Sequence, residues 1–129
     1  MSLVISASNA AYSSFVDYAA SPYGGGARWS LDKHIRRIRT IYNNDPSVMP
    51  CDFPEVIAAL APRPLLTTAP KQDEIFVLTG VMKCLETAGP VYELLGARDN
   101  LQARFPEGAH NFCESERQAA YEFLDEVPK

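Results

Sequence analysis

The sequence lacks several features that would place it in a large class of proteins. It has three cysteines in 129 residues and no C-x-x-C pair, which argues against a disulfide framework or a zinc site. No apolar run approaches the roughly 18 residues that a membrane-spanning helix needs. The formal net charge of -4 gives no overall attraction to nucleic acid or to an anionic membrane. We therefore predict no nucleic-acid or membrane partner and no metal or other cofactor, while the cellular compartment stays open.

A further absence concerns the nucleophile of a serine enzyme. No G-x-S-x-G occurs, so the strained strand-to-helix turn that exposes a catalytic serine is missing. Ser13 and Ser14 have no glycines around them of the kind that such a turn requires. Cys113 follows His110 closely, but nothing nearby in the sequence indicates an activated thiol. The cysteines are best interpreted as free thiols.

What is present indicates one globular domain with alternating strands and helices. Hydrophobic residues make up 47% of the chain, enough to bury a core. Apolar runs predict strands at 3–8, 65–69 and 101–105, and periodic stretches predict helices at 30–42, 52–61, 77–95 and 114–127. The second of these helices begins with a capping box, Asp52 and Glu55, and the third is expected to break or kink near Gly89-Pro90. Residues 9–29 are interpreted as a long irregular stretch. The order predicts an α/β fold, a three-layer α/β/α arrangement with a short parallel sheet of about three strands.

Two loops carry residues with catalytic chemistry. The segment PRPLLTTAPKQDEIF at 62–76 is an apolar run followed by Asp73, and LQARFPEGAHNF at 101–112 is a strand-like run followed by His110. Loops after neighbouring parallel strands meet at one edge of a sheet, so the two side chains are expected to lie together. An acid after one strand and a histidine after the next is typical of a Ser-His-acid hydrolase. Taken singly, Asp73 would be interpreted as a turn or cap residue and His110 as a surface histidine.

Longer runs extend this similarity to a family. DFPEVIAALAPRPLLTTA at 52–69, DEIFVLTGV at 73–81 and GAHNF at 108–112 resemble the α/β-hydrolase superfamily, and within it the acetyl-xylan-esterase and dienelactone-hydrolase-like branch. The resemblance implies that residues 1–129 form a single domain, the last three strands of that fold with their helices, without the nucleophile elbow. It also implies that Asp73 is the triad acid and His110 the general base of a serine-type carboxylic-ester hydrolase of the acetyl-ester or lactone class. Such a chain is expected to be inactive alone and to act on an ester only when the N-terminal half is supplied.

Two other interpretations stay open. In the first, the chain is a stand-alone, non-catalytic α/β module that binds a partner or oligomerises. In the second, the active site is completed between two copies of the chain, with Cys51, Cys113 or a serine of a second copy reaching His110. The strand at Leu3–Ser8 is expected to leave its edge bare, which predicts a homo-oligomer formed through that edge. The helix at 30–42 carries a basic face that is interpreted as solvated and not as a phosphate or nucleic-acid site: Lys33, His34, Arg36, Arg37 and Arg39.

The stretch at 9–29 is rich in aromatic residues. These side chains are expected either to line a substrate pocket or to form a packing surface for the absent half of the fold. They are Tyr12, Phe15, Tyr18, Tyr23 and Trp29.

Overall fold

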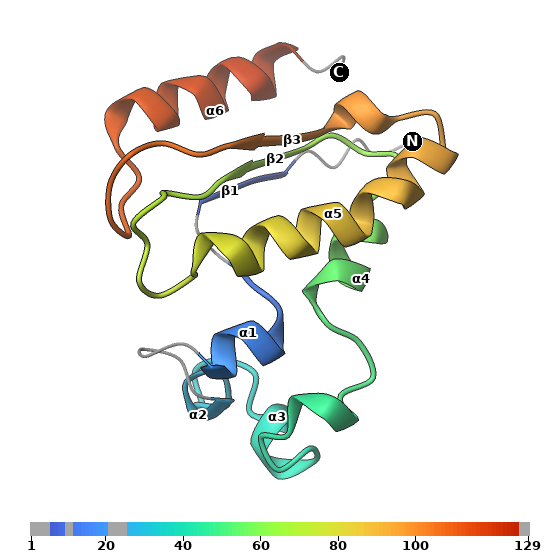
Figure 1. Ribbon diagram of the computed structural model, residues 1–129, viewed down its shortest axis with the longest axis vertical. Helices are drawn as coiled ribbons and strands as arrows, with labels where there is room; N and C mark the ends of the chain where they lie inside the picture. The colour runs from blue at the N-terminus through green and yellow to red at the C-terminus, as the bar shows by residue number, and fades with distance from the viewer. Residues whose placement is uncertain (1–5, 10–11, 21–25, 127–129) are drawn as a thin grey trace.

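The strands and helices alternate along the chain as the sequence predicts. The computed structural model describes residues 6–9, 12–20 and 26–126 (Figure 1). The elements in chain order are β1 (Ser6–Asn9), α1 (Phe15–Ala20), α2 (Gly26–Trp29), α3 (Arg37–Thr40), the short 3-10 helix η1 (Pro46–Val48), α4 (Phe53–Ala58), β2 (Leu65–Thr68), α5 (Leu78–Leu94), the 3-10 helix η2 (Arg98–Asn100), β3 (Leu101–Arg104) and α6 (Glu114–Glu126).

β2 is the central strand of a three-stranded parallel sheet with the order β1-β2-β3. Leu65 of β2 is in register with Ser6 of β1 on one side and with Leu101 of β3 on the other. All four residues of β2 are buried, whereas only Leu101 of β3 is. A parallel strand that is covered on both faces is expected to be apolar or β-branched throughout, and the sequence LLTT fits this description. The predicted sheet of about three strands is confirmed.

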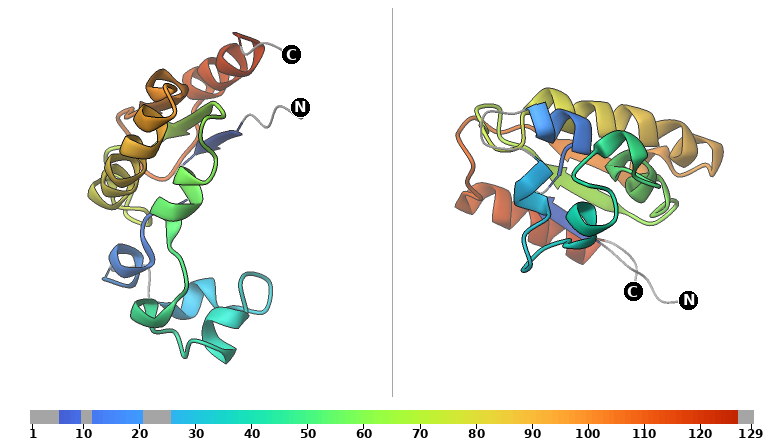
Figure 2. Two further views of the ribbon diagram at one scale, coloured as in Figure 1. Left: turned by 90° about the vertical axis from the view of Figure 1, so that its right-hand side faces the viewer. Right: turned by 90° about the horizontal axis from the view of Figure 1, so that it is seen from below.

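The core lies in two layers, one on each face of this sheet. Successive residues of a strand point to opposite faces, so Leu65 and Leu66 enter different layers. Leu65 packs in a cluster with residues of α4 and α5, among them Ile57 and Val81, while Leu66 packs with Phe123 of α6. Figures 1 and 2 show α4 and α5 on one side of the strands and α6 on the other. The predicted three-layer α/β/α arrangement is therefore confirmed.

Of the break or kink predicted for the long helix, the break is wrong, because α5 continues through Pro90. Residues on both sides of the proline belong to one buried stripe: Cys84 and Ala88 precede it and Tyr92 follows it, and all three are fully buried. The hydroxyl of Tyr92 also donates a hydrogen bond of 3.0 Å to the carbonyl oxygen of Arg63. Packing on both sides outweighs the loss of one helical hydrogen bond at the proline.

The predicted helix at 30–42 is also wrong in its extent. Only α3, four residues long, is helical in this range, and it ends before Asn43 and Asn44, which both have positive φ. Of the apolar residues that define the expected stripe, Ile38 is 3% exposed, but Leu31 and Ile35 are 42% and 45% exposed. Most helical stability in proteins comes from packing of such a face, and here only one of its residues is buried.

The stretch at 9–29 is less irregular than predicted, because it contains α1 and α2. Ser14 begins α1: its hydroxyl accepts a hydrogen bond from the backbone N–H of Asp17 (3.0 Å), as an N-cap side chain does. The remaining predictions agree with the structure to within a few residues. The capping box of α4, formed by Asp52 and Glu55, is confirmed. Residues 3–5 of the first predicted strand and Val127 of the last predicted helix lie outside the described residues. None of the helices in the described part of the chain has the length and apolar character needed to cross a membrane.

Candidate active site

Asp73 lies in the loop after β2 with its carboxylate fully enclosed. Its side chain has 0% exposure. One oxygen, Oδ1, accepts hydrogen bonds from the backbone N–H groups of Ile75 (2.8 Å) and Phe76 (3.0 Å). These bonds arise because the chain turns sharply after β2, which brings the two N–H groups over the carboxylate. The second oxygen, Oδ2, is left to face the neighbouring loop.

His110 lies in that neighbouring loop, between β3 and α6, and its ring contacts the carboxylate. The distance from Nδ1 of His110 to Oδ2 of Asp73 is 2.9 Å. An ionised carboxylate can only accept a hydrogen bond, so the proton in this contact belongs to Nδ1. Nε2 of a neutral ring is then unprotonated and able to accept a proton. The His110 side chain is 44% exposed, so its ring is accessible from solvent.

The two loops continue the pairing of β2 and β3 beyond the ends of the strands. The backbone N–H of Ala69 donates to the carbonyl of Arg104, and that of Lys71 donates to the carbonyl of Pro106, each at 2.9 Å. Where α6 begins, Arg104 also forms a two-armed ion pair with Glu116, at 2.8 Å and 3.1 Å. The predicted proximity of Asp73 and His110 therefore follows from the register of two parallel strands.

The cysteine and serine candidates have partners other than His110. The Sγ atom of Cys113 lies 3.2 Å from Oγ of Ser115. That contact, with backbone hydrogen bonding at the start of α6, holds the pKa of the Cys113 thiol below its ordinary value. Ser13 is buried, and its hydroxyl donates to the carbonyl of Ser14 at 3.3 Å. Within the described ranges, no group of three or more histidine, cysteine or acidic side chains is arranged to hold a metal ion.

A pocket of about 430 Å³ lies beside Phe76, a residue that follows Asp73 closely in the chain. Phe76 connects this pocket to His110, because it lines the pocket and its ring centroid lies 5.9 Å from that of His110. The pocket combines aromatic with cationic side chains, and its lining is Tyr18, Arg28, Trp29, Leu31, Lys33, His34, Ile75 and Phe76. Sequence reasoning missed this group, because Lys33 and His34 were assigned to a solvated helix face and Arg28 was not considered as a site residue.

Of the aromatic residues at 9–29, some line the pocket and others pack. Tyr18 and Trp29 line it, with ring centroids 5.6 Å apart. Tyr12 packs into the core, and its hydroxyl is 2.5 Å from that of Thr67 on β2. Phe15 contacts Phe53 of α4, with centroids 5.2 Å apart. Tyr23 lies outside the described residues.

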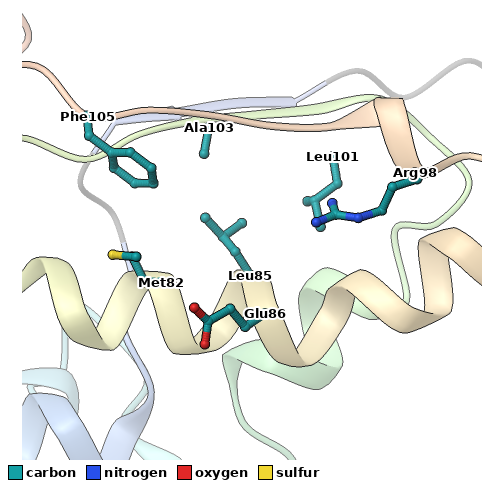
Figure 3. Close-up of a pocket in the computed structure, with 7 residues that line it drawn as sticks. All are labelled: Met82, Leu85, Glu86, Arg98, Leu101, Ala103 and Phe105. Carbon is teal, nitrogen blue, oxygen red and sulfur yellow. The ribbon is translucent and has the colours of Figure 1, made fainter.

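A second hollow, of about 170 Å³, lies along the outer edge of the sheet between α5 and β3 (Figure 3). Leu85 points into it from α5, with Met82 and Phe105 at one end and Arg98 and Leu101 at the other. It contains neither Asp73 nor His110 in its lining. Its lining also lacks Phe76, whose ring contacts His110, whereas Phe76 lines the pocket of about 430 Å³.

The arrangement of the elements is that of part of an α/β-hydrolase fold. The chain is similar to a carbohydrate esterase family 15 (CE15) glucuronoyl esterase from Caldicellulosiruptor kristjansonii, with a TM-score of 0.78 and 24% sequence identity, over 94% of this chain and 36% of that one. It is also similar to a promiscuous CE15 esterase from a marine bacterial metagenome, with a TM-score of 0.59 and 23% identity, over 71% of this chain and 30% of that one. The chain thus spans about a third of the length of these esterases. No protein-family model and no curated protein matches the sequence.

Proposed function

We propose that this chain is the C-terminal part of a serine-type carboxylic-ester hydrolase, with Asp73 as the acid and His110 as the general base of its triad. The hydrogen bond of 2.9 Å between Nδ1 of His110 and the buried carboxylate of Asp73 carries this proposal. The similarity in fold to two CE15 esterases supports it. The serine and the oxyanion-hole donors would come from the part of the fold that precedes these three strands.

In the completed site, His110 would move one proton in each half-reaction. Its Nε2 accepts the proton of the serine hydroxyl as the oxygen attacks the ester carbonyl, and then gives it to the leaving alcohol. In the second half-reaction, Nε2 accepts a proton from water as the water attacks the acyl-serine, and then returns it to the serine oxygen as the acid leaves. Asp73 holds Nδ1–H throughout, which fixes the tautomer and stabilises the imidazolium that forms. The two backbone N–H bonds to Oδ1 keep Asp73 oriented for this role.

The pocket beside Phe76 supports esters of an acidic sugar as the substrate class. Arg28, Lys33 and His34 line it together with Trp29, and such a mixture suits a sugar with polar or charged groups. One of the similar structures is described as a glucuronoyl esterase. Acetyl esters and lactones, the class that the sequence resemblance implies, are the second candidate.

A hybrid protein tests the proposal. The segment of the Caldicellulosiruptor esterase that aligns with this chain would be replaced by residues 1–129, and hydrolysis of methyl glucuronate, an aryl acetate and a lactone would be compared. The isolated chain is expected to be inert, since losing the nucleophile costs on the order of a millionfold in turnover. In the hybrid, His110→Ala should abolish activity and Asp73→Asn should lower kcat on the order of 10⁴-fold.

His34→Ala is the matched control, because it changes the other histidine of the chain. It should raise KM for the glucuronate ester and leave kcat for the aryl acetate unchanged. A folded hybrid with no activity on any ester would contradict the proposal and favour the stand-alone, non-catalytic module. Turnover by the isolated chain that is lost in His110→Ala would instead favour a site completed between two copies.

We also propose that the isolated chain self-associates through β1. This strand pairs with β2 on one side, and no other described strand pairs with it, so an edge is available to a second copy. Light scattering at micromolar concentration should find a dimer or larger species. Ser8→Lys, on this edge, should shift the distribution to monomer, whereas Gln102→Lys, on the opposite edge strand, should not. A monomeric wild-type chain would rule this out.

A further inference from the structure

We propose that Gln72 is a positioning residue for His110. The inference rests on the proposed function, since it explains how the general base of that function is kept in place. Gln72 directly precedes Asp73, so one tight segment after β2 would supply both the triad acid and the group that fixes the histidine loop.

Gln72 binds the peptide groups of Gly108 from two sides. Its backbone N–H donates to the carbonyl oxygen of Gly108 at 3.0 Å. Its side-chain oxygen Oε1 accepts a hydrogen bond from the Gly108 N–H. The other end of the amide, Nε2, donates to Oε2 of Glu107 at 2.7 Å. A single residue thus holds the backbone two positions before His110.

The loop needs this support because its side chains provide little packing. Residues 107–111 are all exposed. Gly108 has φ of +127°, a backbone conformation that residues other than glycine rarely adopt. Nothing lies within 4 Å of the position that a Cβ would occupy. The glycine lets the chain turn here, and the bonds to Gln72 select which turn it makes. Errors of about 1 Å in the place of a catalytic group can cost on the order of a hundredfold in rate.

The chemistry of the amide explains why glutamine suits this position. The site needs an acceptor for the Gly108 N–H and a donor for the Glu107 carboxylate, and a primary amide offers both on one planar group. Lys71 also pairs with Glu107, but that contact is exposed and a surface ion pair adds little. A carboxylate in place of Gln72 would accept from Gly108 and repel Glu107.

Nuclear magnetic resonance of the His110 ring tests the inference on the chain as it is. At a pH where imidazoles are neutral, the wild-type ring should be a single Nδ1–H tautomer, with a downfield proton signal from the bond to Asp73. Gln72→Leu removes the side-chain bonds at similar size and should erase that signal and give a mixture of tautomers. Gln118→Leu, a change at an exposed glutamine on α6, is the matched control and should leave the ring unchanged.

A charge swap separates positioning from general damage. Gln72→Glu alone should lose the downfield signal as Gln72→Leu does, because two carboxylates then face each other. Adding Glu107→Gln should restore the signal, because the amide at 107 then donates to the carboxylate at 72, which still accepts from the Gly108 N–H. If Gln72→Leu does not fold, the single and double swap variants decide the question by themselves. An unchanged His110 ring in a folded Gln72→Glu variant would overturn the inference.

In the hybrid enzyme, Gln72→Leu should lower kcat about tenfold to a hundredfold with little change in KM. Because the ring signals need no turnover, failure here is distinct from failure of the proposed function.

Discussion

Asp52 and Phe15, 37 positions apart, are joined by a hydrogen bond that links the starts of two helices. The carboxylate of Asp52 accepts from the backbone N–H of Phe15, the first residue of α1, at 2.9 Å and 3.0 Å. The same carboxylate accepts from the N–H of Phe53, the first residue of α4. One side chain therefore satisfies backbone donors at two helix N-termini, where no helical partner exists.

Asp52→Ala should lower the free energy of unfolding by about 2 to 3 kcal/mol. A single N-cap typically contributes about 1 kcal/mol, and here a second helix start also loses its acceptor. Urea denaturation monitored by circular dichroism measures the change. Asp45→Ala is the matched control: Asp45 also accepts from a helical N–H, that of Ser47, but its cap serves only the three-residue η1 and is exposed. Equal losses in the two variants would contradict the double cap.

Gly80 and Gly89 should respond differently to substitution by alanine. Both are buried in α5, but a Cβ at Gly80 would lie 2.9 Å from Cβ of Ser13 and 3.1 Å from Cβ of Asp17. A Cβ at Gly89 would come no closer than 3.7 Å to the Arg98 guanidinium. Gly80→Ala should destabilise the protein by about 1 to 3 kcal/mol through overpacking. Gly89→Ala should change the stability by less than about 1 kcal/mol, because the helix preference of alanine is offset by the steric restriction on a residue that precedes a proline, here Pro90. Thermal unfolding followed by circular dichroism compares them, and a stabilising Gly80→Ala would disprove the close contact of α1 with α5.

The Arg104–Glu116 pair should give the protein part of its stability in neutral solution and lose it in acid. Arg104 holds the pKa of the Glu116 carboxyl below its ordinary value. This stability is present above the ordinary glutamate pKa and is lost as the pH falls through the lowered pKa of the folded state. Glu116→Gln should cost about 1 kcal/mol at neutral pH, a modest figure because the Arg104 side chain is 48% exposed. Denaturation curves from neutral to acidic pH should show the two proteins converging, and a constant difference would argue against the pair.

The three thiols should separate by accessibility. Burial raises the pKa of Cys84 to about 12, and its side chain has no exposure. Cys51 and Cys113 are exposed. A thiol-specific chromogenic reagent should titrate two cysteines in the native protein and the third only after denaturant is added. With its pKa lowered by Ser115, Cys113 should still react as the pH is reduced, and Ser115→Ala should slow it. Rapid reaction of all three thiols would mean that α5 does not pack as described.

The parts of the fold that sequence reasoning predicted correctly are those where local signals and packing agree. β2 has a continuous run of buried, apolar or β-branched residues between turns, and α4 begins with a complete capping box. Asp73 and His110 were found because each follows a strand, and parallel pairing then brings the loops together. The catalytic role of the pair stays a prediction.

The errors occur where distant contacts outweigh local pattern. The stripe of Leu31, Ile35 and Ile38 has helical spacing, but only Ile38 is covered. Pro90 would break an isolated helix, yet the buried face around Tyr92 keeps α5 continuous. α1 has a weak helical pattern and depends on Asp52, which is remote in sequence. The pocket was missed for the same reason, since its lining is assembled from α1, α2, the turns after α2 and the loop after Asp73.

Trp29 is the only tryptophan in the chain, and its place gives the molecule a built-in optical probe. Its ring lies 5.6 Å from that of Phe53, 6.2 Å from Phe76 and 6.3 Å from His34, measured between centroids. The tryptophan emission of this protein, excited selectively at a wavelength where its six tyrosines absorb little, therefore originates entirely at the pocket lined by Phe76. Any compound that enters that pocket should change the emission directly, so ligands can be screened by titration without a label, an added reporter group or a catalytic assay.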